Sequence, residues 1–234
     1  MTEIDEQLAG LSSESPAPDP AAELLRMVEA DGAARRRQPW RQLALSLVVG
    51  LGLAIGALFV LGLRRDLSHL PVSYLVSAAI AWLTAIAVVG ALAFVPSSKT
   101  SLPRVRMAAF ATVVSGLFFI ALGLLWTEAA PGHSFFYQPG AGQVLRYAPY
   151  CLSVGTATSL VPLALGALLL RRTVPIDTPW MGAAIGALGG CIGGLLLHFH
   201  CDIAEPTHFG LVHGGVVVVA AGLGALVLPR RLAL

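Results

Sequence analysis

Long apolar stretches separated by short polar ones dominate the chain after about residue 42. Six of these runs approach the roughly 20 residues that an α-helix needs to cross a bilayer. They lie at approximately 43–63, 72–94, 107–126, 152–170, 180–197 and 211–228. The runs lack the period-two alternation of membrane β-strands, and only helices satisfy their own backbone groups inside lipid. The pattern therefore predicts an all-α, polytopic membrane protein built as a six-helix transmembrane bundle.

Composition and charge agree with this interpretation. Hydrophobic residues make up 56% of the chain and charged residues 12%, and the mean hydropathy is +0.77, which excludes a soluble domain of 234 residues. If the amino terminus is cytoplasmic, twelve of the 15 Lys and Arg residues fall on the cytoplasmic side, and Arg64, Arg65 and Arg146 fall outside. The positive-inside rule thus predicts that both termini are cytoplasmic.

Residues 1–41 form a polar tail that precedes the transmembrane region, 42–234. The tail is acidic up to residue 31, and its apolar residues recur at helical spacing in two short parts. These residues are Ile4 and Leu8 in the first part and Leu24, Leu25 and Val28 in the second. Asp19 is placed to cap the second helix. A helix this short is marginal alone, so we expect it to fold into an apolar and basic groove of a protein partner. The alternative is a tail without a partner.

The fifth run has a helix face almost free of side chains. Glycines recur there at every fourth position, at Gly182, Gly186, Gly190 and Gly194. Small residues at this spacing allow two helices to approach closely in a membrane. The sixth run, which also contains several glycines, is the expected partner of this face.

The turn between the fifth and sixth runs carries most of the candidate chemistry. Four of the six histidines, one of the three cysteines and two carboxylates fall within residues 198–213. These residues are His198, His200, Cys201, Asp202, Glu205, His208 and His213. Cys151, at the start of the fourth run, is expected at the same membrane depth as Cys201. Imidazole, thiolate and carboxylate bind zinc or copper, and two thiols form a disulfide on oxidation, so we predict an outward-facing sensor or metal site. The alternative is a polar turn with no function of its own.

Several short motifs in the last third of the chain resemble a known family. They are Cys151-Leu152-Ser153, Val161-Pro162-Leu163, Leu170-Arg171-Arg172, the pair His200-Cys201 and Pro229-Arg230-Arg231. Together with the glycine-rich fifth run, they resemble the NrsF-type membrane anti-sigma factors, and the overall layout is similar to that of the CarR-type factors. The histidines at 208 and 213 depart from the family pattern.

This resemblance implies a regulator of the bacterial inner membrane that is not an enzyme. Its tail would sequester an extracytoplasmic-function (ECF) sigma factor, and Cys151 and Cys201 would be needed for release. The extra histidines favour a metal or singlet oxygen as the signal, besides other oxidants. Membrane lipid is the other expected partner, no nucleic acid is bound directly, and homodimerisation stays open.

Two other functions use the same residues, a metal transporter and a metal-dependent membrane enzyme. A transporter commonly places a charged residue inside a span, and the six runs contain no Asp, Glu or Lys. The chain also lacks the HExxH spacing that is typical of a zinc hydrolase. The sequence therefore favours the regulator.

Overall fold

The computed structural model describes six helical elements of this chain beyond its first 38 residues. They are α3 (Pro39–Leu61), α4 (Val72–Phe94), α6 (Ala141–Leu170), α7 (Thr178–His200), η1 (His208–His213) and α8 (Gly214–Leu232). The residues described are 19, 21–26, 39–68, 70–94, 113, 114, 117, 141–170, 178–203 and 208–232. Helices are the only regular structure in these ranges, so the predicted all-α class is confirmed. The chain divides into two units, residues 1–38 and residues 39–234.

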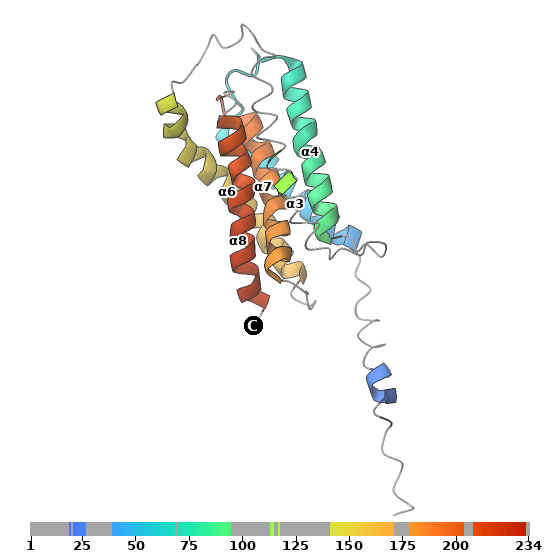
Figure 1. The fold of residues 1–234 in the computed structure, drawn as a ribbon. Coiled ribbons are helices and arrows are strands. Elements are labelled where there is room, and N and C mark those ends of the chain that lie inside the picture. The colour runs from blue at the N-terminus through green and yellow to red at the C-terminus, as the bar shows by residue number, and fades with distance from the viewer. Residues whose placement is uncertain are drawn as a thin grey trace, which may run out of the picture. The chain divides into compact units, whose positions relative to one another are not determined.

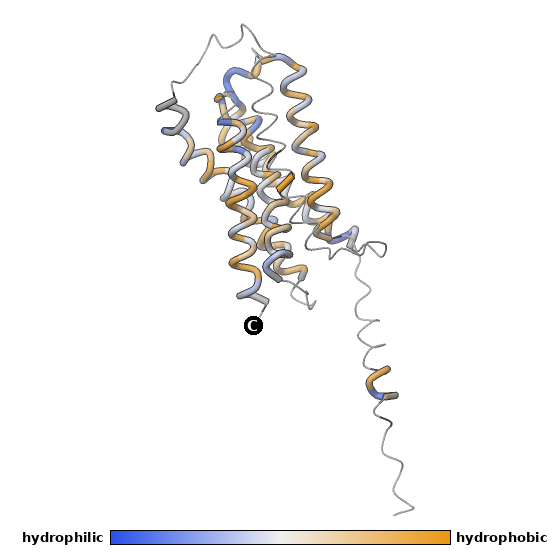
Figure 2. The backbone as a smooth tube through the Cα atoms, viewed as in Figure 1, coloured by the Kyte–Doolittle hydropathy of each residue, from blue (hydrophilic) through white to orange (hydrophobic). Residues whose placement is uncertain are grey.

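Five helices of the second unit are long and apolar enough to cross a membrane. They span Trp40–Leu61, Val72–Phe94, Arg146–Leu169, Pro179–His200 and His208–Pro229. Figure 2 shows hydrophobic residues along the lengths of these helices and hydrophilic ones gathered near their ends. The protein is therefore a multi-pass membrane protein. The third predicted run, 107–126, lies outside the described residues except at Val113, Val114 and Leu117.

One helix boundary differs from the sequence-based expectation. Residues 141–150 were expected in a loop, but α6 already begins at Ala141. A hydropathy run marks where a helix enters the membrane, whereas the helix itself continues through polar residues such as Gln143 and Arg146. As a result, Cys151 lies inside a helix, where its backbone is hydrogen-bonded and its position is fixed.

Helix α7 forms the centre of the bundle and contacts α3, α4, α6 and α8 (Figure 1). In the apolar 18-residue segment of α7 that can cross the membrane, 83% is buried, compared with 22% in the corresponding segment of α3. Alternating small and large residues make this possible, because Leu188 and Ile192 fill the core while the glycines between them admit neighbouring helices. Of the five described spans, α7 is thus the most enclosed and α3 the least.

The four predicted packing glycines face two different neighbours. An added Cβ at Gly182 or Gly186 would collide with a backbone carbonyl group of α8, and one at Gly190 would lie 2.6 Å from the Cα of Val217. Gly194 instead lies against the ring of Trp82 in α4. The reason is geometric: four residues advance an α-helix by about 400°, so a four-residue repeat drifts by roughly 120° between the first glycine and the fourth.

The described part of the tail contains one short helix, at residues 21–26. Asp19 caps it, since Oδ1 of Asp19 accepts a hydrogen bond of 2.9 Å from the backbone N–H of Ala21. Leu24 and Leu25 project from this helix with 60% and 61% of their surface exposed. The other predicted partner-binding residues, Ile4, Leu8 and Val28, lie outside the described residues.

Candidate functional site

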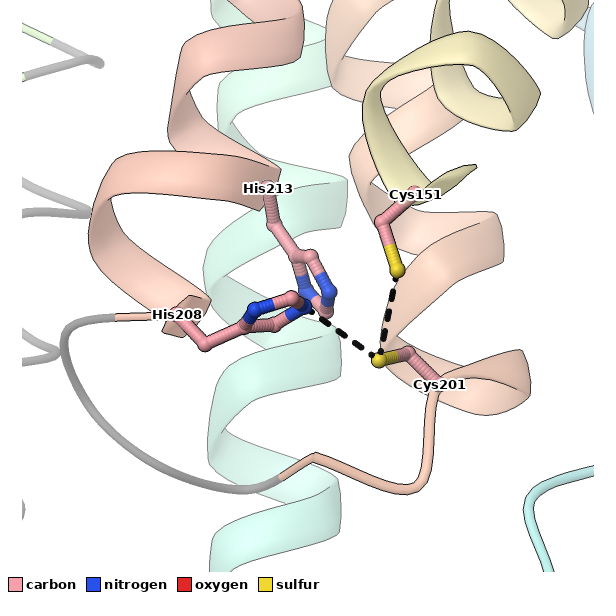
Figure 3. A group of neighbouring side chains, drawn as sticks. All are labelled: Cys151, Cys201, His208 and His213. Carbon is pink, nitrogen blue, oxygen red and sulfur yellow. Dashed lines mark hydrogen bonds between the residues drawn. The ribbon is translucent and has the colours of Figure 1, made fainter. Parts of the chain in front are cut away.

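Four metal-binding side chains converge at the end of the bundle where α7 stops. Cys151 of α6, Cys201 just after α7, and His208 and His213 of η1 are all buried, and their ligand atoms lie within 4.8 Å of one another. Figure 3 shows the two histidine rings and the two thiols pointing toward a common centre. These residues are called the Cys/His group below. The group could hold a metal ion.

The two histidines meet because η1 is a π-helix. His208 and His213 are five residues apart, and five residues of an α-helix advance by about 500°, which would separate their side chains by roughly 140°. The wider turn of a π-helix, with its i→i+5 hydrogen bonds, brings such residues onto one side. The ring centroids of His208 and His213 are consequently 5.3 Å apart.

The two cysteines are directly hydrogen-bonded to each other. The Cys151 thiol donates to the Sγ of Cys201 across 3.6 Å, and Nε2 of His208 lies 3.5 Å from the same sulfur. The bond from Cys151, together with His208 and His213, holds the pKa of Cys201 below its usual range, although burial acts in the opposite direction. Cys201 is therefore more readily deprotonated than an ordinary thiol, and the thiolate is the form of cysteine that binds metals and attacks oxidants.

The spacing of the group suits a tetrahedral metal ion. With Zn–S bonds of about 2.3 Å and Zn–N bonds of about 2.0–2.1 Å, a tetrahedral site needs S···S and S···N separations of roughly 3.8 and 3.6 Å. The observed separations are 3.6 Å for the cysteines and 3.5 Å for Cys201 and His208. Both ring nitrogens of the buried His213 also have no hydrogen-bond partner among the described residues. A nitrogen left in this way costs free energy unless a ligand takes it. The residues present therefore fit a metal ion.

An apolar shell encloses the Cys/His group. Leu197, Ile203, Val212 and Val216 pack with the two cysteines in one buried cluster. In such surroundings an uncompensated charge is costly. Two thiolates, two neutral imidazoles and a divalent cation carry no net charge, so the shell favours a divalent ion over monovalent copper.

The remaining predicted site residues do not join the group. The ring of His198 is directed toward α4, where its Nε2 lies 3.2 Å from the carbonyl oxygen of Leu75. His200 bonds to the loop after α3 and to Tyr150, and Asp202 accepts a hydrogen bond from the same loop. Glu205 lies outside the described residues. Cys201 differs from His198 because it follows the last residue of α7 and turns toward α6 and η1.

Sequence reasoning missed Arg64 beside this group. Arg64 is only 3% exposed, and its Nε and Nη2 bond to the two carboxylate oxygens of Asp66 at 2.6 and 2.8 Å. Burial acts to lower the pKa of Arg64, but the pairing with Asp66 outweighs it, so the pKa is raised and the guanidinium stays charged. The available signal was its place among the three basic residues assigned to the outer side. The positive-inside rule expects few basic residues on the outer side, so a basic residue found there often has a structural role.

Fold and site together define a multi-pass helical membrane protein whose buried Cys/His group could hold a metal ion. A family profile described as "NrsF: Negative regulator of sigma F" matches residues 27–233 of the chain. Because this match covers most of its length, the chain belongs to the NrsF family of negative regulators of a sigma factor, as the sequence motifs indicated. Comparison with curated proteins and with solved structures gave no match.

Proposed function

We propose that this protein is an anti-sigma factor of the bacterial inner membrane that holds an ECF sigma factor through its cytoplasmic tail. A signal outside the membrane acts on Cys151, Cys201, His208 and His213, and the sigma factor is then released. The sensing role is supported by the buried side chains of the Cys/His group, whose four ligand atoms lie within 4.8 Å of one another. They occur in a member of a family of sigma-factor regulators. Both termini are cytoplasmic in this proposal, which places the Cys/His group on the outer side.

Metal binding would contract the Cys/His group. Its ligand atoms spread over as much as 4.8 Å, whereas the edges of a tetrahedral zinc site are roughly 3.4–3.8 Å. The ligand atoms that lie farthest apart would therefore be drawn together when an ion binds, while the Cys201 sulfur already lies 3.6 Å from Cys151 and 3.5 Å from His208. Zinc is the ion that the charge argument favours, and copper is the alternative that a metal titration distinguishes.

Oxidation of the two cysteines to a disulfide would also contract the Cys/His group. A two-electron oxidant takes one electron pair from the two thiol groups, their remaining proton leaves, and an S–S bond forms between Cys151 and Cys201. The sulfurs would then approach from 3.6 Å to about 2.05 Å. Singlet oxygen can act as this oxidant. A metal ion and an oxidant can therefore both bring the side chains of the Cys/His group closer together.

The geometry argues for a sensor rather than an enzyme or a transporter. Catalytic zinc keeps one coordination position open for water, whereas four protein ligands complete a tetrahedral shell. All four residues of the Cys/His group are buried, which also gives a substrate no access. A closed site of this kind suits an ion that changes the conformation of the protein.

Capture of the sigma factor by the full-length chain tests the proposal. Leu24→Asp together with Leu25→Asp should abolish capture, because burial of each leucine contributes about 1.5–3 kcal/mol. Ala22→Asp adds a charge to the same helix away from the apolar stripe and serves as the matched control. The measurement is co-purification from membranes, with each sigma factor of the host identified by mass spectrometry. Equal recovery with the double variant and with the control would reject the tail as the binding element.

A further inference from the structure

The loop that follows α3 is fastened to the last turn of α7. The backbone N–H of Arg64 donates to the carbonyl oxygen of Phe199 at 2.9 Å, and Nη1 of Arg64 donates to that of His198 at 3.0 Å. The final carbonyl groups of a helix lack partners within the helix, and they carry the negative end of its dipole. Arg64 satisfies two of them with a positive charge, while Asp66 fixes the guanidinium from the other side.

Two further hydrogen bonds extend this contact past Cys201. Nδ1 of His200 donates to the carbonyl oxygen of Gly62 at 2.9 Å, and the backbone N–H of Arg65 donates to Oδ1 of Asp202 at 2.7 Å. Four hydrogen bonds therefore join residues 62–65 to residues 198–202. Cys201 lies within the second of these segments, so a displacement of Cys201 acts directly on the loop.

Helix α3 connects this loop to the tail. It begins at Pro39, directly after the tail unit, and runs unbroken to Leu61. At 1.5 Å per residue its 23 residues cover about 35 Å, which is enough to cross the roughly 30 Å of a membrane core. One rigid element thus spans the distance between the Cys/His group and the first residue after the tail.

Within the described residues, the loop end of α3 packs less closely than its middle, since Ala57 and Leu58 there contact the core and are only partly buried. None of the residues 55–61 is buried, and Ala54 is the last buried residue of the helix. Nearer the middle, Gly50 approaches Ile192 of α7, where an added Cβ would lie 2.7 Å from its Cδ1. The helix is therefore closely packed near Gly50, and the bonds to residues 198–202 add to the partial packing of Ala57 and Leu58 at its loop end.

We infer that Arg64 is the positioning residue that couples the Cys/His group to the tail. With Asp66 it links α3 to the segment that carries Cys201, so contraction of the Cys/His group displaces the loop end of α3. The helix transmits this displacement to residue 39 and the sigma-binding tail. The inference rests on the proposed function and names the route by which the signal crosses the membrane.

Hydrogen exchange of the full-length chain in lipid nanodiscs tests this route, with Zn²⁺ as the probe. In the wild type, Zn²⁺ should change the exchange rates of the Arg64 and Arg65 amides and of residues 55–61 by tenfold or more. In Arg64→Met, which loses the guanidinium bonds but keeps the backbone bonds, Zn²⁺ should still change exchange in residues 198–203, and the change in residues 55–66 should be at least threefold smaller than in the wild type. Arg65→Met removes the same charge from the same loop but keeps the backbone bond, and it should behave like the wild type.

Binding is followed separately with Co²⁺, whose thiolate complexes absorb visible light. Arg64→Met should keep the tetrahedral Co²⁺ spectrum, with an affinity reduced by no more than about 100-fold, the range seen when groups that orient metal ligands are lost. A sigma-dependent reporter should stay repressed and no longer respond to Zn²⁺. A purely structural role of Arg64 would instead remove metal binding and response together, and that outcome overturns the inference.

Two further results would also overturn it. One is a wild-type chain that binds Zn²⁺ with no change of exchange in residues 55–66, a result that needs no variant. The other is a zinc-dependent change in α3 that is as large in Arg64→Met as in the wild type. If this variant does not fold, Asp66→Asn keeps the side-chain shape and should reduce the change in α3 at least threefold. The exchange measurement contains no sigma factor, so its failure is distinct from failure of the tail variants.

Discussion

Cys151 and Cys201, fifty residues apart in sequence, lie with their sulfur atoms 3.6 Å apart in a buried hydrogen bond. One belongs to the interior of α6 and the other to the first position after α7. This S···S distance is longer than a disulfide bond, which is about 2.05 Å, and it is close to the spacing of two thiolates that bind one metal ion. A single contact therefore gives the protein two chemical ways to respond to its surroundings.

Removal of one sulfur should separate sensing from repression. Cys201→Ala is expected to eliminate high-affinity Co²⁺ binding and to leave the sigma-dependent reporter repressed, because the tail and the loop bonds of Arg64 are retained. Cys191→Ala is the matched control, since Cys191 is buried in the middle of α7 away from the Cys/His group. Derepression by Cys201→Ala at normal protein level would show that Cys201 fastens the structure instead of sensing a signal.

Metal affinity should depend on pH in a way that reports the protonation of the pair. Because its pKa is lowered, Cys201 loses its proton more readily than an ordinary thiol, and the proton that a metal ion mainly displaces on binding is that of Cys151. Zinc affinity should therefore rise about tenfold per pH unit between about pH 7 and 8. Competition titrations in nanodiscs measure this slope. A rise near 100-fold per unit would mean that both thiols are protonated before the ion binds.

The close contact of α7 and α8 makes a prediction about stability. Gly186→Ala places a methyl group against the backbone of Ala220 and should lower the free energy of unfolding by about 1–3 kcal/mol. Gly222→Ala meets no atom within 4 Å and should be neutral or stabilise by up to about 1 kcal/mol, as expected from helix propensity. Thermal unfolding in detergent compares the two. The larger change Gly190→Leu should disturb repression and metal binding together.

Periodicity and hydropathy were sufficient for the helices but not for the site. The runs matched both ends of α4 and located the ends of α3 and α7 to within four residues, because lipid imposes a length and an apolar composition on each span. Proximity in the sequence also assigned Cys201, His208 and His213 to one candidate site. It also included His198 and Asp202, whose side chains the structure directs elsewhere.

The missing information is local backbone geometry. The π-turn that aligns His208 with His213 has no signature in the apolar pattern, and the direction of Cys201 depends on where α7 ends. Arg64 escaped notice because its burial results from contacts 134 residues away. Contacts of this range follow from the packing of helices and not from the order of residues along one of them.

The most direct test of the account is the affinity of the sigma factor for the full-length chain in nanodiscs, measured with and without Zn²⁺. We predict tight binding of the sigma factor without Zn²⁺ and at least tenfold weaker binding once Zn²⁺ occupies the Cys/His group. In Cys201→Ala, Zn²⁺ should not change this affinity. Unchanged affinity in a wild-type chain that has bound one equivalent of Zn²⁺ would contradict it.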